Sequence, residues 1–212
     1  MSEELIQGTP EWLAARCGKV TASRVADVIA KTKSGWGASR ANYMAELIAE
    51  RLTGSPAASF TNAAMQWGTD HEPEARDAYA FRTDAEIVQV GMVDHPTIPL
   101  TSCSPDGLVG DMGLVEIKCP NTATHIDTLL SGTVPAKYIT QMMWQMACTR
   151  RTWCDFVSYD PRLPESMRLF VKRVEAAPSQ IDEIEFQVKF FLEELDAKVS
   201  ELRALYEMKE AA

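Results

Sequence analysis

The segment Leu114–Lys118 constrains the fold more than any other part of the sequence. Its apolar and charged residues alternate, which is the pattern of a β-strand with two different faces. On one face Val115 and Ile117 are expected to enter a hydrophobic core. On the other face Glu116 and Lys118 are expected to point into a cleft. The chain should therefore contain a sheet with a packed side and a side that carries polar chemistry.

Asp106 is the natural partner of this strand. It lies in the turn Ser104-Pro105-Asp106-Gly107, and nine residues separate it from Glu116. A hairpin-like return of that length can bring the two carboxylates together, and such a pair favours a hard cation such as Mg²⁺. The Ile117 carbonyl offers a third oxygen. Lys118 can position or deprotonate a water, because nearby cations lower the pKa of a lysine. The set suits phosphodiester hydrolysis, although such acid and lysine pairs also occur as surface ion pairs.

Periodicity and turn residues predict the surrounding elements. Thr9 caps a helix that begins at Pro10, Lys31 to Ala38 is a loop, Gly68 and Pro73 perturb a helix, and Ser179 with Asp182 forms a capping box. We expect a helix that begins at residue 10, further helices over 21–30, 39–53, 62–81, 135–150 and 179–206, and strands over 86–92, 100–103, 114–118, 153–159 and 167–174. The fold class is α+β, a central mixed sheet flanked by helices.

One domain is expected over residues 1–212, because the chain contains no internal repeat and no low-complexity linker. The last segment, residues 175–212, carries an apolar stripe from Ile181 to Tyr206 at steps of three and four. Such a stripe usually packs a helix on the domain body. A contact with a partner helix or a second subunit is the alternative interpretation.

The overall net charge of −9 is unfavourable for binding nucleic acid, whose phosphates are negative. The charge is unevenly distributed. Residues 16–51 hold seven basic against three acidic residues, whereas residues 175–212 hold ten acidic against four basic. A basic N-terminal region remains available for DNA, although both regions could simply be solvated faces.

Cysteine spacing and hydropathy bear on localisation. The five cysteines are scattered and contain no C-x-x-C pair, which favours reduced thiols in the cytoplasm over disulfides or a zinc site. No window approaches ~18 consecutive apolar residues, and the first ten residues lack an apolar signal core. We therefore expect neither a membrane span nor a secretion signal.

Asp106 with Glu116-Ile117-Lys118 resembles the motif of the PD-(D/E)XK nuclease superfamily, whose core is restriction-endonuclease-like. The wider strings 102–108 and 114–120 resemble the phage lambda exonuclease, or YqaJ-type viral recombinase, family. Further matches run in order from Trp12 to Val174, and include Thr21-Ala22-Ser23, Trp67-Gly68 and Tyr159-Asp160-Pro161-Arg162.

This resemblance implies a Mg²⁺-dependent 5′→3′ exonuclease that degrades one strand of linear double-stranded DNA. It leaves 3′ overhangs for phage-type single-strand annealing recombination. It also implies a two-metal site in which Mn²⁺ can substitute, a ring-shaped homotrimer around DNA ends, and a partner single-strand annealing protein. The setting would be the cytoplasm of a bacterial host, with a phage or prophage gene.

The same resemblance implies roles for individual residues, and each also has a plainer interpretation. Asp106, Glu116 and the Ile117 carbonyl would hold metal, Lys118 would activate water, and Glu72 would be a further active-site acid or a solvated helix residue. A 5′-phosphate pocket would comprise Arg16, Ser23, Ser104 and Gln141. Of these, Ser23 could instead cap a helix and Gln141 could be an ordinary polar helix residue. Met65 would wedge open the duplex end or belong to the core, and Lys33 would contact the DNA backbone or its minor groove.

Two other functions are the alternatives, and the carboxylate pair argues against the second. A structure- or sequence-specific endonuclease on the same fold would need no free end and no 5′-phosphate pocket. A non-catalytic scaffold that binds DNA ends would have no use for a carboxylate pair that demands metal.

Overall fold

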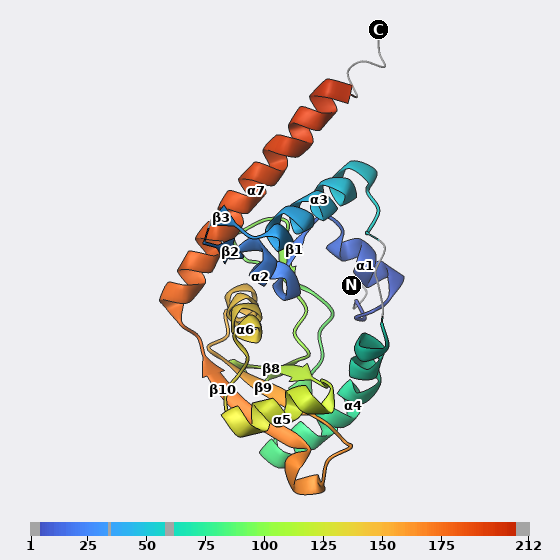
Figure 1. Cartoon of the computed structure of the whole chain (residues 1–212), viewed down its shortest axis with the longest axis vertical. Helices are drawn as coiled ribbons and strands as arrows, with labels where there is room; N and C mark the ends of the chain where they lie inside the picture. The colour runs from blue at the N-terminus through green and yellow to red at the C-terminus, as the bar shows by residue number, and fades with distance from the viewer. Residues whose placement is uncertain (1–4, 34, 58–61, 207–212) are drawn as a thin grey trace.

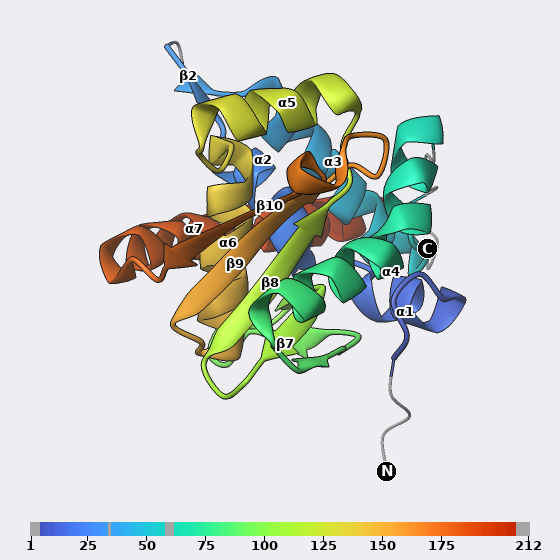
Figure 2. The same cartoon turned by 90° about the horizontal axis from the view of Figure 1, so that it is seen from below.

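The computed structural model describes residues 5–33, 35–57 and 62–206. Its centre is a five-stranded sheet in the order β10-β9-β8-β7-β4 (Figure 2). The parallel pair is β8 (Gly113–Lys118) with β9 (Trp153–Tyr159), and the other neighbours are antiparallel. The outer strands are β7 (Gly107–Val109), β4 (Ile87–Val88) and β10 (Leu169–Glu175). The expected mixed sheet is confirmed.

Helices cover both faces of this sheet (Figures 1 and 2). On one face, α4 (Ala63–Thr83) packs against β8, β9 and β10. There Val115 and Ile117 are buried in one cluster with Tyr79 of α4. On the other face, Leu114 of β8 is buried in the main core, which α6 (Ala136–Thr149) also enters. The alternation along β8 therefore separates two hydrophobic cores, whereas the sequence predicted a core on the face of Val115 and Ile117 only and an open cleft on the other.

A smaller sheet and a hairpin lie on the α6 side of the molecule. The smaller sheet has the order β1-β6-β5, formed by β1 (Val20–Thr21), β6 (Thr101–Cys103) and β5 (Val93–Asp94). Strand β1 continues into η1 (Ala22–Arg24) and α2 (Val25–Val28), where one helix was predicted over 21–30. The prediction of a loop over 31–38 is wrong, because β2 (Lys31–Thr32) and β3 (Gly35–Trp36) pair as a hairpin.

Local capping explains the ends of the first helices. In α1 (Pro10–Arg16), the Thr9 side chain accepts a hydrogen bond from the backbone of Trp12. Next, α3 (Ala38–Thr53) ends at Gly54, which has a left-handed backbone (φ 66°) that glycine adopts without steric cost. Both predictions are confirmed. The predicted irregularity does not interrupt α4, which continues through Gly68 and Pro73.

One helix that the sequence analysis missed lies between β8 and α6. It is α5 (Thr122–Ser131), capped by the Asn121 side chain and ended by Gly132 in a left-handed conformation. Its residue His125 is fully buried and contacts Ser158 on β9. Helix α5 therefore fixes the chain that follows Lys118. A short turn, η2 (Glu165–Met167), lies between β9 and β10.

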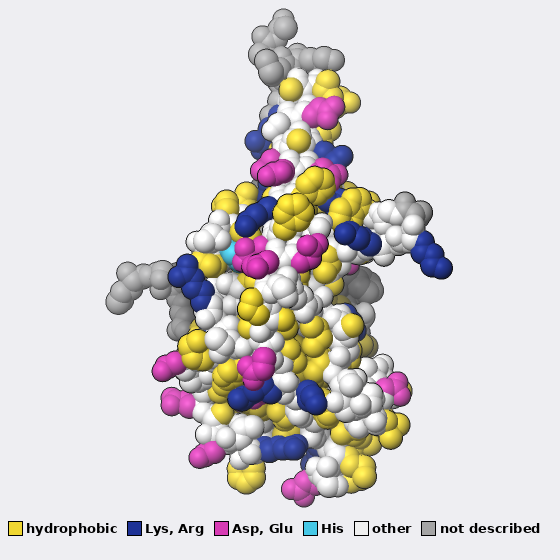
Figure 3. All heavy atoms as spheres, turned by 90° about the vertical axis from the view of Figure 1, so that its left-hand side faces the viewer, with side chains coloured by type: hydrophobic (Ala, Val, Ile, Leu, Met, Phe, Trp, Pro, Cys, Tyr) yellow, Lys and Arg dark blue, Asp and Glu magenta, His cyan; other side chains and the backbone are white. Residues whose placement is uncertain are grey.

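The last helix, α7 (Pro178–Tyr206), extends away from the body at its C-terminal end (Figure 1). Its apolar stripe is buried from Ile184 to Val199, but Tyr206 is exposed. The predicted capping box is wrong, because the helix begins at Pro178 and Ser179 lies inside its first turn. Acidic, basic and apolar side chains are interspersed over this side of the molecule (Figure 3). Within the described ranges, no helix has the length and apolar character to cross a bilayer.

Candidate functional site

The hairpin β7–β8 brings Asp106 to Glu116. Gly107 pairs with Val115 in the antiparallel register, so the residue before β7 lies beside the residue after Val115. The Asp106 Oδ2 atom accepts a hydrogen bond from the Ile117 backbone amide at 2.6 Å. This bond fixes the Asp106 carboxylate against the strand that carries Glu116 and Lys118. The predicted hairpin that brings Asp106 beside the strand of Glu116 is confirmed.

The Glu116 side chain is more deeply buried than that of a residue lining an open cleft. It is 0 % exposed, where the sequence analysis expected it to face an open cleft. Two amides on the same face of α6 donate to it: Gln141 Nε2 to Oε1 and Gln145 Nε2 to Oε2, each at 2.6 Å. A buried carboxylate is tolerated only where such donors replace water. Helix α6 therefore holds Glu116 in one orientation.

Lys118 completes this cluster from the exposed side. Its ammonium group forms an ion pair with Glu116, and its side chain is 28 % exposed. Burial alone would lower the pKa of Lys118, but attraction to Glu116 and then to Asp106 outweighs it, so the pKa is raised. In this arrangement Lys118 is an ammonium group that donates hydrogen bonds. It acquires base character only where cations offset the two carboxylates, which is the condition that the sequence analysis assumed.

The carboxylates carry more negative charge than Lys118 balances. Burial, and then repulsion from Glu116, raises the pKa of Asp106 well above its ordinary value, against the opposing attraction of Lys118. Glu72 on α4 adds to this repulsion, so it lies within electrostatic range of Asp106. Glu72 is itself half-buried and forms an ion pair with Arg76 one turn along the helix.

This donor set fits a hard divalent cation. Asp106 and Glu116 supply carboxylate oxygens, the ligands that Mg²⁺ prefers, and the unbalanced negative charge favours a cation. Mg²⁺ commonly uses only one or two carboxylates and completes its shell with water and phosphate oxygens. In the described part of the chain, no three His, Cys, Asp or Glu side chains form a group that could hold a metal ion.

A cavity of about 160 Å³ adjoins this cluster. Among the residues that line it are the four assigned to a phosphate pocket: Arg16, Ser23, Ser104 and Gln141. Because Gln141 also donates to Glu116, a single side chain connects the cavity to the carboxylates. The structure therefore brings together four residues from four separate stretches of the sequence.

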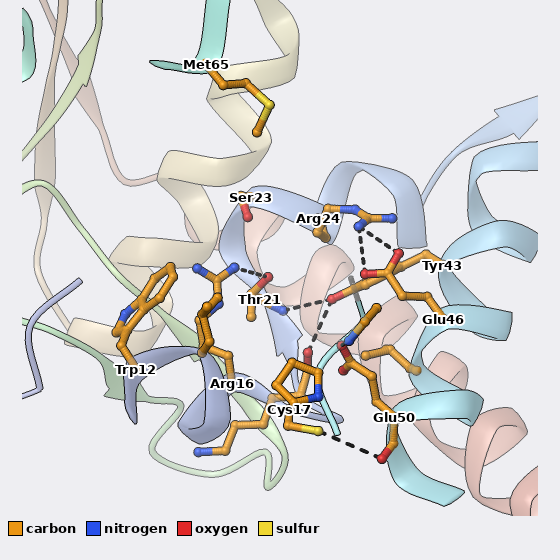
Figure 4. Close-up of a pocket in the computed structure, with 15 residues that line it drawn as sticks. Trp12, Arg16, Cys17, Thr21, Ser23, Arg24, Tyr43, Glu46, Glu50 and Met65 are labelled. Atoms are coloured by element: carbon orange, nitrogen blue, oxygen red, sulfur yellow. Dashed lines mark hydrogen bonds and ion pairs between the residues drawn. The ribbon is translucent and has the colours of Figure 1, made fainter. Parts of the chain in front are cut away.

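Arg16 is the cation of this cavity. Its guanidinium group stacks on Trp12 at 4.0 Å and donates to Thr21 Oγ1 at 3.2 Å (Figure 4). Within the described residues, no carboxylate forms an ion pair with it at 4.0 Å or less. Burial is the main cause that lowers the pKa of Arg16, with only partial compensation from Tyr43 and Glu50. A partly buried cation in this state favours an anion beside it.

The remaining predicted residues lie farther from the carboxylates. Met65, in the first turn of α4, is 55 % exposed and lines a second, larger cavity that also contacts Arg16 and Ser23 (Figure 4). Its exposure argues against the alternative of a core position. Lys33 is exposed in the turn of the β2–β3 hairpin.

Three further residues contact these groups; Trp12 and Thr21 were predicted only as part of the family match, without a role in the site, and Gln145 was not predicted at all. Gln145 donates to Glu116, Trp12 donates to Ser104 and stacks under Arg16, and Thr21 accepts from Arg16. Gln141 and Gln145 stand four residues apart in α6, so they share one face. That spacing was the available sequence evidence for Gln145.

Comparisons with known proteins agree with this geometry. Residues 11–152 match the family described as YqaJ-like viral recombinase domain. The chain is similar to an alkaline exonuclease (LHK-Exo) from Laribacter hongkongensis, whose crystal structure is known, with 55 % sequence identity. The alignment covers 96 % of this chain and 100 % of that chain, and the two structures superpose with a TM-score of 0.88. A structure of LHK-Exo in complex with dAMP has 55 % identity, the same coverage and a TM-score of 0.89.

A more distant structure shares the fold. The phage related exonuclease from Haemophilus somnus 129PT is 17 % identical, with 87 % of this chain and 96 % of its own covered and a TM-score of 0.71. A search of curated proteins found no match.

Proposed function

The chain belongs to the YqaJ-like viral recombinase family, and from this premise we propose that it is an exonuclease acting on linear double-stranded DNA. It removes nucleotides from the 5′ end of one strand and leaves a 3′ single-stranded overhang. Residues 1–212 act as one exonuclease domain. The observation that carries this proposal is the bridge through Gln141, which contacts Glu116 and also lines the cavity around Arg16.

We assign phosphodiester hydrolysis to the cluster on β8. Asp106, Glu116 and the Ile117 carbonyl would hold Mg²⁺ at two positions, and Mn²⁺ could replace it because both ions accept oxygen ligands. When bound, these ions supply Lewis-acid chemistry that offsets negative charge developing on the phosphodiester. Glu72 is the further acid of this cluster, within electrostatic range of Asp106.

Lys118 orients the attacking water, because its ammonium group is directed at Glu116 from the more exposed side of the cluster. The water oxygen forms a bond to phosphorus, and the bond from phosphorus to the 3′ oxygen of the terminal nucleotide breaks. One water proton ends on that 3′ oxygen, and the other stays with the new phosphate or passes to solvent. The shortened strand keeps a 5′-phosphate, so every cycle regenerates the same kind of end.

The smaller cavity holds this 5′-phosphate. Arg16 supplies a guanidinium group without a carboxylate partner, which can grip two phosphate oxygens at once. Hydroxyls of Ser23 and Ser104 and the amide of Gln141 add hydrogen-bonding groups. The released product would be a deoxynucleoside monophosphate, the same class of molecule as the dAMP in the LHK-Exo complex.

Contacts with the rest of the duplex follow from two exposed residues. Met65 is apolar, exposed and close to the cavity that contacts Arg16, which suits a wedge between the strands at the duplex end. Lys33 extends from the β2–β3 hairpin and suits a backbone contact.

The remaining proposals rest on family membership. Three copies would form a ring around DNA, and the 3′ overhang would pass to a single-strand annealing protein of phage recombination. The protein would act in the cytoplasm of a bacterial host from a phage or prophage gene.

The experiment that tests the assignment compares Asp106→Asn and Glu116→Gln with the unaltered protein on linear duplex DNA. Each change keeps the shape of the side chain and removes its charge. We expect cleavage to be lost in both variants, and to be lost in the unaltered protein when EDTA removes divalent cations. Circular dichroism checks that the variants fold. Folded variants that cleave at the unaltered rate, or cleavage in EDTA, would overturn the assignment.

A further inference from the structure

The cavity assigned to the 5′-phosphate is continuous with further space on one side. A second cavity of about 550 Å³ lies next to it, lined by α1, α3 and the start of α4. The two cavities share four lining residues, Trp12, Arg16, Thr21 and Ser23. A phosphate held by Arg16 therefore has a larger space beside it (Figure 4).

The sizes of the two cavities suit different groups. Pockets that hold compact organic ligands usually measure ~300–1,000 Å³. The smaller cavity falls below this range and suits a phosphate group, whereas the larger cavity, at about 550 Å³, falls within it. The larger cavity can therefore accept a group the size of a nucleoside.

Most charged groups that line the larger cavity already have partners. Arg24 forms ion pairs with Asp27 and Glu46, and Lys19 forms one with Asp94. The buried Glu50 carboxylate accepts hydrogen bonds from the backbone amides of residues 18 and 57. Among the described residues that line this cavity, Arg16 is then the one cation without an ion-pair partner, and it lies on the side shared with the phosphate cavity.

Apolar side chains supply much of the remaining wall, among them Leu13, Leu47 and Met65. Apart from Arg16, which holds the anchored phosphate, this cavity offers no unpaired cation, so it disfavours a second phosphate, which would lose its hydration without gaining a counter-charge. It suits an uncharged sugar and base. These properties select a nucleoside over a diphosphate or triphosphate end.

We propose that the larger cavity binds one unpaired nucleoside on the 5′ side of the anchored phosphate, so that the substrates include 5′ ends with a one-nucleotide flap. This inference rests on the proposed function, because it assumes that Arg16 anchors a phosphate. When the first nucleoside occupies the larger cavity, the phosphodiester between the first and second nucleosides occupies the smaller cavity. Hydrolysis breaks the next phosphorus–3′ oxygen bond, and the first product is a dinucleotide with a free 3′ hydroxyl.

The test uses three linear duplexes that differ only at one 5′ end: a blunt phosphate, a blunt hydroxyl, and a hydroxyl with one unpaired nucleotide. The flap supplies an internal phosphate without opening a base pair. Because one stacking step is worth ~1.4 kcal/mol, or about tenfold, we expect the flap to start digestion about tenfold faster than the blunt hydroxyl. Mass spectrometry of the first product should give a dinucleotide from the flap and a mononucleotide from the blunt phosphate.

The outcomes separate this inference from the proposed function. The subsite alone is overturned if the enzyme prefers the blunt phosphate to the blunt hydroxyl but digests the flap no faster than the blunt hydroxyl. Release of a single nucleoside from the flap would have the same meaning. No preference for the blunt phosphate removes the phosphate pocket, and the subsite with it.

Two neighbouring residues on α1 give a matched pair of variants. Leu13 lines the larger cavity and not the smaller one, whereas Ala14 is exposed and lines neither. The measured quantity is the ratio of dinucleotide to mononucleotide released from an equal mixture of the flap and the blunt phosphate. We expect Leu13→Trp, which fills the cavity, to lower this ratio about tenfold, and Ala14→Trp to leave it unchanged. An unchanged ratio in Leu13→Trp contradicts the subsite.

Discussion

Glu116 shows how the chain keeps a charged group inside its core. A carboxylate removed from water is stable only with donors around it, and two α6 amides with the Lys118 ammonium supply them. The donors also fix the orientation of the carboxylate. The contacts that make the buried Glu116 carboxylate stable are therefore the same ones that orient it for chemistry.

Lys118→Ala should reduce the cleavage rate about 100-fold or more, the usual size of a proton-transfer or water-orienting contribution. Binding to DNA ends should persist, because Arg16 and not Lys118 lines the proposed phosphate cavity. Single-turnover cleavage and fluorescence anisotropy measure the two quantities. Lys137→Ala is the matched control, since both lysines lie over the Tyr138 ring but Lys137 is exposed. Unreduced turnover in Lys118→Ala would contradict its role.

Arg16→Ala should narrow the preference for 5′-phosphate over 5′-hydroxyl ends by about tenfold or more, because a hydrogen bond to a charged group contributes about 1.5–3 kcal/mol. Arg16→Lys keeps the charge but loses the planar fork, so it should recover part of the preference. Initial digestion rates on the two kinds of end provide the ratio. Equal losses on both ends would remove Arg16 from phosphate recognition.

At the scale of single elements, α5 links the strand of the active cluster to the rest of the sheet. His125 is fully buried, and its ring nitrogens contact Ser158 Oγ at 2.7 Å and the Met167 carbonyl at 2.8 Å. Ser158 pairs with Lys118 in the β8–β9 register. A helix of ten residues therefore fixes the backbone around Lys118.

His125→Ala should lower the free energy of unfolding by about 2–5 kcal/mol, because it leaves a cavity and two unsatisfied polar groups. Leu130→Ala on the same helix is the control, since Leu130 is 83 % exposed and its loss should cost little. Urea unfolding followed by circular dichroism measures both. Equal stability of the two variants would contradict the anchoring role of His125.

Elements also show what the sequence could and could not predict. The alternation along β8 and the turn at Asp106 are local patterns, and both predicted the observed geometry. The burial of Glu116 and the contact from Gln145 depend on how α6 lies across the sheet, which no local pattern specifies. Helix α5 was missed because Thr122 and Thr124 are weak helix formers, although Asn121 and Gly132 marked its ends.

At the scale of the whole molecule, distant segments assemble the site. Arg16 comes from α1, Ser104 follows β6, and Gln141 comes from α6, yet all three line one cavity. Family resemblance grouped them in advance, whereas spacing alone could not, because more than 80 residues separate the first from the second.

The proposed ring predicts an assembly of three chains of 23.5 kDa in solution. A closed ring around DNA suits an enzyme that starts at an end and does not dissociate between cycles. Sedimentation equilibrium over a range of protein concentrations measures the mass. A mass of one or two chains at the concentrations where DNA is digested would contradict the ring.

The most direct test of the central claim is digestion of duplex DNA with each strand labelled separately, with and without Mg²⁺. The substrates are linear DNA with 5′-phosphate or 5′-hydroxyl ends and a covalently closed circle of the same sequence. We predict Mg²⁺-dependent loss of the 5′-terminated strand, fastest with phosphate and absent on the circle. Cleavage of the circle would instead indicate an endonuclease, and no cleavage of any substrate would indicate a scaffold that binds DNA ends.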